Sequence, residues 1–316
     1  MVFVQNLSVG YQKGKEKNLL LDHIDVSLPS GKLVCLLGSN GSGKSTFLKT
    51  LAGIHPPLSQ PADQTLIEFQ KPGNIAIVLT DKLNLSNLSV YDLVTTGRYA
   101  YVNWLIQLSE TDKHAINQAF HLVGIDQLKD KFVDELSDGQ QQMVMIARAL
   151  AQETPYIFLD EPTAHLDLNN RMEIMTLLRK LAHQHNKTIL VSTHELDLAL
   201  QLADVLWLVQ DKKIVSGIPE ELVLDGVLDK AFPLKGFNLK TGEMNYEKTK
   251  NKSIQLIGEG YRYLWTKNAF ERMGFSVINE KAEIQIEVEK EYWKIDSNRY
   301  NRLQLLLEDL INREIK

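Results

Sequence analysis

The strongest chemical signal in the sequence is a glycine-rich loop that lies between an apolar run and a helix-like segment. Its residues are Gly38, Ser39, Asn40, Gly41, Ser42, Gly43, Lys44, Ser45 and Thr46. In such a loop the backbone N–H groups point inward and the following helix adds positive potential, so the expected ligand is a polyphosphate. The pattern predicts that Lys44 reaches the β- and γ-phosphates and that the Ser45 hydroxyl coordinates Mg²⁺. The alternative, a glycine turn before a helix, is disfavoured by the flanking strand and helix signals.

A second candidate is a pair of carboxylates that ends the apolar run Tyr156–Leu159. Asp160 suits a carboxylate linked to Mg²⁺, and Glu161 suits a base that orients an attacking water. Alone this pattern is weak, because many buried strands end in acidic turn residues. Together with the phosphate loop it predicts a nucleoside triphosphatase.

Apolar runs of β type alternate with helical stretches through the first two thirds of the chain, which predicts an α/β fold with a largely parallel sheet. Such a sheet presents chemistry at the C-terminal ends of its strands. From Ser89 to Gln152 the strand signals stop, and we predict an inserted helical subdomain over about residues 89–152. A helix is expected at Lys44–Ala52, and strands at Val2–Val9, Ile24–Leu28, Leu33–Leu37, Ile75–Leu79, Tyr156–Leu159, Thr188–Ser192 and Val205–Val209.

The composition predicts a division into a large domain over residues 1–235, a polar linker over 236–252 and a small α+β module over 253–316. In the module, apolar residues that alternate with charged ones indicate a sheet with one solvated face. No motif in it indicates chemistry, so strengthening a dimer, sensing a ligand and merely stabilising the protein all remain open roles. Its expected elements are strand Ser253–Ile257, helix Tyr263–Met273, strands Phe275–Val277 and Glu283–Val288, and helix Arg299–Ile315.

The overall composition is that of an ordinary globular protein. The chain has 316 residues, 44% hydrophobic and 24% charged, with a net charge of -5. This balance offers no general electrostatic reason to bind nucleic acid or an anionic membrane. The single cysteine, Cys35, lies in an apolar run and is expected to be an inert core residue in a reducing compartment. Because no apolar stretch reaches 18 residues, we expect any membrane function to come through a partner.

Over approximately residues 1–230 the chain resembles the nucleotide-binding subunit of ABC transporters. The segment Leu136-Ser137-Asp138-Gly139-Gln140 is similar to the signature sequence of that family, with Asp138 where glycine is commonest. The resemblance implies that the signature residues Ser137, Asp138, Gly139 and Gln140 bind the γ-phosphate of the ATP held by an opposite subunit. It therefore implies a head-to-tail homodimer. A helix N-cap at Ser137 is the alternative interpretation, and it is compatible with this role.

Three further residues match functional residues of the family, and a fourth position departs from it. Asp167 resembles the contact between subunits, and His194 resembles the switch histidine that contacts the γ-phosphate and holds Glu161. A surface histidine at a strand end is the alternative for His194. Tyr11 resembles the aromatic residue that stacks on adenine. Thr80 stands where the family usually has a glutamine that touches Mg²⁺, so its hydroxyl either reaches the metal through water or leaves only a hinge role to residues 80–88.

The implied fold is a P-loop NTPase of ABC type, with a RecA-like core, an antiparallel β subdomain and a helical subdomain. The implied cofactors are ATP and Mg²⁺. The implied mechanism is attack of water on the γ-phosphate in a closed dimer, whose opening after hydrolysis moves a separate integral-membrane permease. This places the chain on the cytoplasmic face of the inner membrane.

The segment from Leu85 to Gln107 is the usual permease docking surface of the family, with candidates Val90, Leu93, Arg98 and Trp104; core packing is the alternative for Val90 and Leu93. Its run LSVYDLVTTGRYAYVNW most resembles importers of iron-siderophore, haem or cobalamin type, although Ala100 replaces a proline. Such importers also use an extracytoplasmic binding protein, which this chain contacts only indirectly.

The competing function is a soluble ABC-type ATPase that acts on nucleic acid or the ribosome. Such proteins typically have two nucleotide sites or a long coiled coil, whereas this sequence has one phosphate loop and no sustained heptads. We therefore expect no nucleic-acid partner. A nucleotide-gated module without hydrolysis is disfavoured because Glu161 and His194 are present.

Overall fold

The computed structural model describes residues 1–14, 16–59, 69, 71–80, 87–102, 107–232, 237–238, 243–244, 253–278 and 280–314. The chain divides into two compact units, Met1–Pro233 and Leu234–Lys316, and each is described by itself. Most of the predicted linker lies outside the described residues. Within it, β9 (Phe237–Asn238) pairs antiparallel with β10 (Glu243–Met244).

The first unit is built on a six-stranded sheet in the order β4-β5-β6-β3-β7-β8. All neighbours pair in parallel except β7 and β8, which form a hairpin. The sequence signals did not indicate β8, whose pairing depends on a two-residue turn with positive φ at Asp211 and Lys212. The strands are β3 (Leu33–Leu37), β4 (Ile75–Val78), β5 (Tyr156–Asp160), β6 (Thr188–Thr193), β7 (Val205–Gln210) and β8 (Lys213–Gly217).

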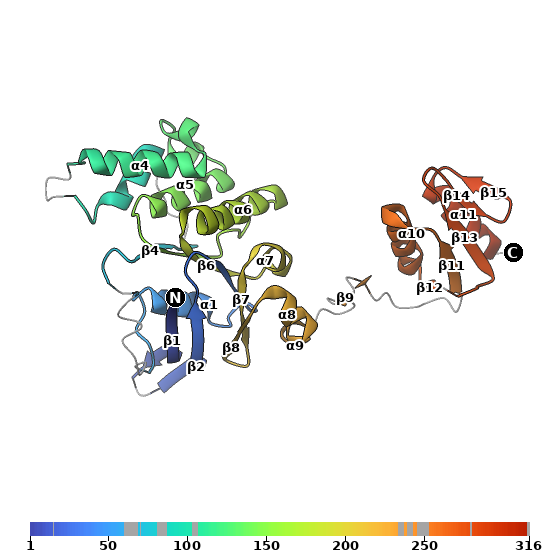
Figure 1. Ribbon diagram of the computed structural model, residues 1–316, viewed down its shortest axis with the longest axis horizontal. Helices are drawn as coiled ribbons and strands as arrows, with labels where there is room; N and C mark the ends of the chain where they lie inside the picture. Colours follow the sequence, from blue (N-terminus) through green and yellow to red (C-terminus); the bar gives the residue numbers. More distant parts are fainter. Residues whose placement is uncertain are drawn as a thin grey trace. The chain divides into compact units, whose positions relative to one another are not determined.

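An antiparallel pair of long strands, β1 (Val2–Lys13) and β2 (Glu16–Leu28), packs beside this sheet (Figure 1). Its buried apolar residues join the same hydrophobic core as Phe47 of the first helix and Trp207 of β7. Cys35 is fully buried in β3, and burial raises the pKa of its thiol to about 12. The predicted parallel core, the antiparallel β pair and the core position of the cysteine are thus all found in the structure.

Helices cover the sheet. The segment of the chain that connects β4 to β5 forms a separate helical cluster, in which α4 and α5 lie side by side (Figure 1). Serine side chains cap several of these helices: Ser109 begins α4, and Ser137 begins α5 with Gln140 completing a capping box. The helices are α1 (Lys44–Leu51), α3 (Val90–Thr95), α4 (Glu110–Val123), α5 (Asp138–Leu150), α6 (Leu168–His185), α7 (Leu196–Leu202), α8 (Pro219–Leu224) and α9 (Val227–Ala231). Short 3₁₀ turns occur at Thr96–Arg98, Asp126–Leu128 and Val133–Glu135.

The second unit is a five-stranded sheet in the order β12-β11-β13-β14-β15 with two helices. Its elements are β11 (Ser253–Ile257), α10 (Gly260–Arg272), β12 (Ser276–Ile278), β13 (Ile284–Val288), β14 (Trp293–Ile295), β15 (Asn298–Tyr300) and α11 (Leu303–Glu314). The sequence prediction of only two strands after α10 was wrong, as was the start of the last helix at Arg299. Arg299 lies in β15, because a turn at Asp296, with a φ of 52°, folds β14 and β15 into a hairpin too short to show a period.

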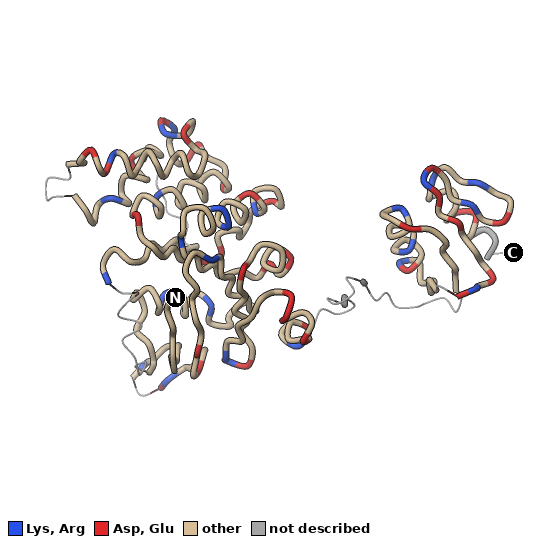
Figure 2. Tube along the Cα trace, in the orientation of Figure 1, with Lys and Arg blue, Asp and Glu red and all other residues tan. Residues whose placement is uncertain are grey.

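The second unit has its own hydrophobic core, which includes Phe270, Phe275 and Leu306. One face of α10 is exposed and apolar, with Tyr261, Leu264 and Trp265 at helical spacing. Acidic and basic residues are interspersed in both units (Figure 2). In the described part of the chain, no helix is both long and apolar enough to cross a bilayer.

Candidate nucleotide site

The phosphate loop connects β3 to α1 and depends on left-handed glycines. Gly41 and Gly43 have φ angles of 77° and 98°, a region that side chains with a Cβ rarely adopt. The ammonium of Lys44, which is 4% exposed, lies within the loop and donates to the carbonyls of Gly38 at 2.9 Å and Ser39 at 3.1 Å. Burial lowers the pKa of Lys44, and the nearby Glu161 and Asp160 oppose that effect.

The two predicted carboxylates lie at the end of β5, next to the start of α1. Asp160 Oδ1 accepts hydrogen bonds from Ser45 Oγ at 2.9 Å and from Ser192 Oγ at 2.5 Å. Glu161 has a left-handed φ of 48°, and its N–H donates to the carbonyl and the hydroxyl oxygen of Ser192, both at 3.0 Å. Lys44 Nζ lies 3.8 Å from Glu161 Oε1, and His194 Nδ1 lies 3.6 Å from Glu161 Oε2.

Ser192 is a site residue that the sequence analysis did not identify. It faces Asp160 because β5 and β6 pair in parallel with these two residues in register. The available signal was its place near the end of a buried strand, just before His194. Its hydroxyl fixes the side chain of Asp160 and the backbone of Glu161 together.

An open cleft with about 900 Å³ of empty space lies over the phosphate loop. Tyr11 stands at its edge, half exposed, with its hydroxyl 2.9 Å from Thr46 Oγ1 and its ring in a T-shaped contact with that of His55. Thr80 also lines the cleft, and its hydroxyl donates to the Asp160 carbonyl at 2.9 Å. The full lining is Tyr11, Leu20, Asn40, Gly41, Gly43, Lys44, Ser45, Thr46, Thr80 and Glu161.

The predicted signature residues do not line this cleft. Ser137 caps α5, while Gly139 packs so closely on α6 that an added Cβ would lie 2.8 Å from Asn170 Cγ. Asp167 caps α6 and accepts hydrogen bonds from the backbone N–H and the side chain of Asn170. Ser137, Gly139 and Gln140 line a different cleft, of about 640 Å³, next to Asn170. Within a single chain, therefore, the phosphate loop and these three signature residues line different clefts.

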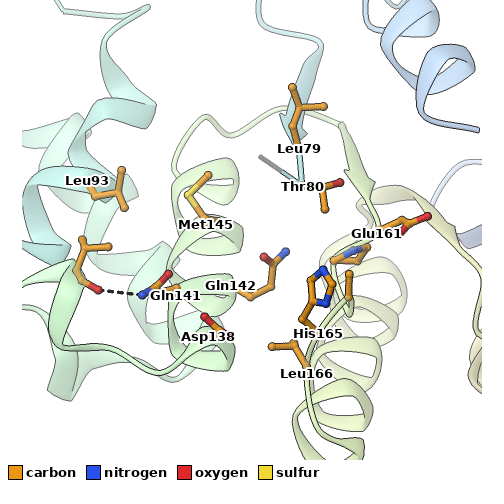
Figure 3. Close-up of a pocket in the computed structure, with 13 residues that line it drawn as sticks. Leu79, Thr80, Leu93, Asp138, Gln141, Gln142, Met145, Glu161, His165 and Leu166 are labelled. Atoms are coloured by element: carbon orange, nitrogen blue, oxygen red, sulfur yellow. Dashed lines mark hydrogen bonds between the residues drawn. The ribbon is translucent and has the colours of Figure 1, made fainter. Parts of the chain in front are cut away.

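A third cleft, of about 730 Å³, lies between α5 and the loop after β5 (Figure 3). Asp138 and Gln142 line it from α5, opposite Glu161 and His165. It shares Thr80 and Glu161 with the cleft over the phosphate loop. Any group that enters this cleft therefore approaches Glu161.

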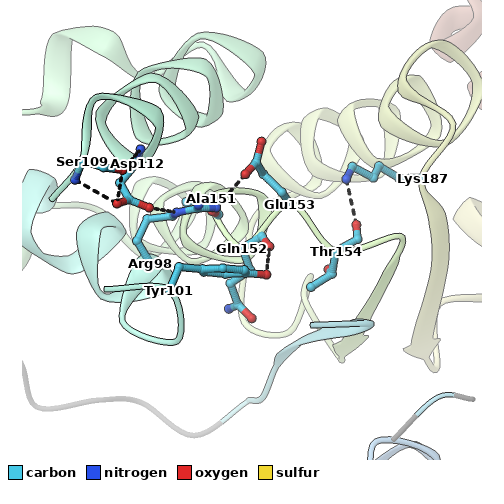
Figure 4. A network of polar contacts seen from close by, with 9 residues as sticks. All are labelled: Arg98, Tyr101, Ser109, Asp112, Ala151, Gln152, Glu153, Thr154 and Lys187. Carbon is cyan, nitrogen blue, oxygen red and sulfur yellow. Dashed lines mark hydrogen bonds and ion pairs between the residues drawn. The ribbon is translucent and has the colours of Figure 1, made fainter. Parts of the chain in front are cut away.

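Three docking candidates from the sequence are buried, which corrects that part of the prediction. Val90 and Leu93 belong to the core, at 0% and 3% exposure, so the alternative interpretation holds for them. Arg98 is also buried and lies in a polar network (Figure 4). Its Nε donates to Asp112 Oδ1 at 2.8 Å, and its Nη1 donates to the Ala151 carbonyl and to Glu153 Oε2. Trp104 lies outside the described residues.

Replacing Arg98 by alanine is expected to lower the free energy of unfolding by about 3 kcal/mol, because Asp112 would stay buried without its cation. The pKa of Asp112 is lowered by hydrogen bonds from the Ser109 side chain and backbone, and then by Arg98. Because the pKa of Asp112 is lower in the folded than in the unfolded protein, the ionised carboxylate stabilises the fold at any pH above the unfolded pKa of about 3.9. This stabilisation is lost as the pH falls through the folded pKa. Urea unfolding at pH 7 and pH 3.5 measures the free energy of unfolding of the wild type and of the variant. The control is Lys113→Ala, which removes one partner of an exposed ion pair and is expected to leave the free energy of unfolding nearly unchanged. Equal stabilities of the Arg98 variant and the wild type at pH 7 would contradict the prediction.

Comparison with known proteins agrees with this geometry. The profile of the family described as ABC transporter matches residues 21–164, and the profile described as iron ABC transporter C-terminal domain matches residues 251–312. The achromobactin transport ATP-binding protein CbrD of Dickeya dadantii is 38% identical over 242 residues, which cover 74% of this chain and 87% of that protein.

The chain belongs to the ABC transporter family, as an ATP-binding subunit. A putative metal-chelate type ABC transporter in an inward-facing conformation is a structural neighbour of this ABC subunit, with a TM-score of 0.64, 30% identity, and coverage of 74% of this chain and 89% of that one. A dimeric ATP-binding cassette in a post-hydrolysis state, with ADP and Pi bound, matches with a TM-score of 0.56 and 25% identity, covering 69% of this chain and 99% of that one.

The family assignment decides the general activity of the ABC subunit, which is ATP hydrolysis coupled to transport. It binds adenine nucleotide and works as a peripheral component of a membrane transporter. The competing function on nucleic acid or the ribosome is disfavoured.

Proposed function

We propose that this chain hydrolyses ATP as half of a head-to-tail homodimer, docked on a separate permease at the cytoplasmic face of the inner membrane. The observation that carries the proposal is the division of the site within one chain. The phosphate loop lines one cleft, while Ser137 and Gly139 line another. A second copy in opposite orientation would bring its signature residues to the first copy's nucleotide. The cassette described above, which is dimeric, supports the formation of a dimer.

In this arrangement each side chain has a distinct task. Lys44 and the loop N–H groups bind the β- and γ-phosphates, and Tyr11 provides a ring for the adenine. Glu161 orients the attacking water and accepts its proton, while His194 holds Glu161 and contacts the γ-phosphate. Ser137 Oγ and the N–H groups at the start of α5 in the second copy stabilise the developing charge. Asp167 contacts the second copy.

The oxygen atoms around Asp160 suit a magnesium ion. Ser45 Oγ and Asp160 Oδ1 are hard ligands only 2.9 Å apart, and Mg²⁺ binds proteins through one or two such oxygens together with substrate phosphates. When bound, Mg²⁺ neutralises charge on the β- and γ-phosphate oxygens. Thr80 Oγ1 donates to the Asp160 carbonyl, so its lone pairs remain to accept from a metal-bound water.

Replacing Thr80 by valine, which has a similar volume, is expected to remove one hydrogen bond and about 1 kcal/mol of stability. If Thr80 also holds a metal-bound water, the Mg²⁺ concentration for half-maximal ATPase activity rises about two- to fivefold. A magnesium titration of ATPase activity makes the measurement, with Thr154→Val as the control because Thr154 is a buried residue remote from the cleft that also donates to a carbonyl. An unchanged titration would remove Thr80 from the metal site.

The cargo proposed is an iron-siderophore, haem or cobalamin-type compound, delivered by an extracytoplasmic binding protein to the permease. Two findings support this class: the match to the iron ABC transporter C-terminal domain, and the achromobactin transport for which the relative CbrD is named. The cargo itself would touch the permease and not this chain.

Tagging the chain and identifying what co-purifies from native membranes tests this proposal. Recovery of a polytopic permease is expected, and the family of that permease would narrow the cargo. Recovery of ribosomal or DNA-bound proteins without a permease would favour the competing function instead.

A further inference from the structure

One arginine connects the two loops that border Glu161. Arg171 lies in the first turn of α6, and its Nε donates to the Leu166 carbonyl at 2.6 Å. Its Nη1 lies 3.1 Å from Glu195 Oε1. Leu166 precedes the predicted subunit contact Asp167, and Glu195 follows the switch histidine His194. The guanidinium group therefore holds both loops at once.

Stability does not account for the carboxylate of Glu195. Its side chain is only 7% exposed, and its Oε2 is buried without a hydrogen-bond partner among the described residues. A buried carboxyl group with an unsatisfied oxygen destabilises a fold, and an apolar side chain of similar volume is often the more stable choice. A buried carboxylate that is kept despite this cost is a candidate for a role in positioning its neighbours.

The position that Glu195 specifies is that of its neighbour His194. The side chain of His194 is 49% exposed, so packing restricts it little, yet its Nδ1 lies 3.6 Å from Glu161 Oε2. The residue that follows His194 holds its backbone in place, because the Glu195 N–H donates to Thr193 Oγ1 at 3.0 Å and the Glu195 carboxylate is bound to Arg171.

We propose that Arg171 and Glu195 are positioning residues, which tie His194 to the Asp167 loop so that contact with the second subunit aligns His194 and Glu161. This inference rests on the proposed roles of Asp167, His194 and Glu161. Breaking the tie leaves the phosphate loop intact, so ATP still binds, whereas hydrolysis slows because the histidine no longer follows the subunit contact.

The test uses the full-length protein and the variants Arg171→Ala, Glu195→Gln and the double variant. The matched control is Arg179→Ala, two turns further along α6: Arg179 also donates to a carbonyl, that of Leu202, pairs with Asp204, and has the same 37% side-chain exposure. Steady-state ATPase kcat is measured together with the dissociation constant for ATP by calorimetry. Arg171→Ala and Glu195→Gln are each expected to lower kcat about 10- to 100-fold with the ATP affinity nearly unchanged.

The double variant is expected to lose no more activity than the more damaged single variant, because both changes act on the same connection. Values of kcat close to that of Arg179→Ala, or losses that multiply in the double variant, would overturn the proposal. If circular dichroism shows that Arg171→Ala is unfolded, the kcat values of Arg171→Lys and Glu195→Gln test the proposal. Lysine keeps the charge of arginine but lacks the planar fork that reaches two partners. A His194→Ala variant distinguishes failure of this inference from failure of the proposed function on which it rests. Normal turnover in that variant would contradict the proposed role of His194 itself.

Discussion

Replacing Glu161 by glutamine is expected to lower the ATPase kcat by about 10²- to 10⁴-fold, the contribution typical of a general base. Glutamine has nearly the same shape but accepts no proton from water. The left-handed turn that aims residue 161 is held by hydrogen bonds from the Glu161 N–H to the Ser192 carbonyl and hydroxyl oxygens, which the change leaves in place. ATP binding should therefore persist.

The glutamine variant should also accumulate as an ATP-bound dimer, because hydrolysis no longer reopens the closed state. Phosphate release measures the first effect, and size-exclusion chromatography with and without ATP measures the second. Glu220→Gln, at an exposed position in the first turn of α8, is the matched control and should resemble the wild type. Turnover at the normal rate in the Glu161 variant would show that another group acts as the base.

Replacing Lys44 by alanine is expected to weaken ATP binding by about 100-fold or more, because a buried, hydrogen-bonded cation that pairs with phosphate contributes several kcal/mol. The ammonium already lies inside the loop, bound to the carbonyls of Gly38 and Ser39. These carbonyls hold it where the phosphates are expected. Turnover should fall with binding, and ATP should no longer drive dimer formation.

Calorimetric titration with ATP measures this loss, and Lys49→Ala at the end of the same helix is the matched control. Lys49 does not line the cleft, so its removal should leave the affinity for ATP nearly unchanged. The Lys44 and Glu161 variants also separate two functions, since the first should fail to bind ATP and the second should fail to hydrolyse it. Wild-type affinity in the Lys44 variant would remove this residue from the phosphate site.

The structure relates these two residues to a wider set of contacts. One carboxylate oxygen of Glu161 lies near the ammonium of Lys44, and the other lies near the ring of His194. Ser192 holds the turn beneath it, and Arg171 connects the loops on either side. Catalysis in this chain is therefore expected to be sensitive to residues that never contact nucleotide.

The sequence by itself determined the phosphate loop, the two carboxylates and the parallel core. Each of these is a contiguous segment whose residue order already carries its physical reason: glycines for a loop of inward N–H groups, and an apolar strand that delivers Asp160 to its end. Most of the predicted strands of the first unit were confirmed within about two residues, the usual uncertainty of element ends.

Only the tertiary structure decided which distant residues meet. Ser192 joins the site through the register of two strands, and the buried state of Arg98 follows from partners on two other segments, Asp112 and Glu153. The hairpin of β14 and β15 has strands too short for a period to appear. Arg171 and Glu195 carry no motif at all, because a contact between two loops depends on how the helices behind them pack, and local sequence does not encode that packing.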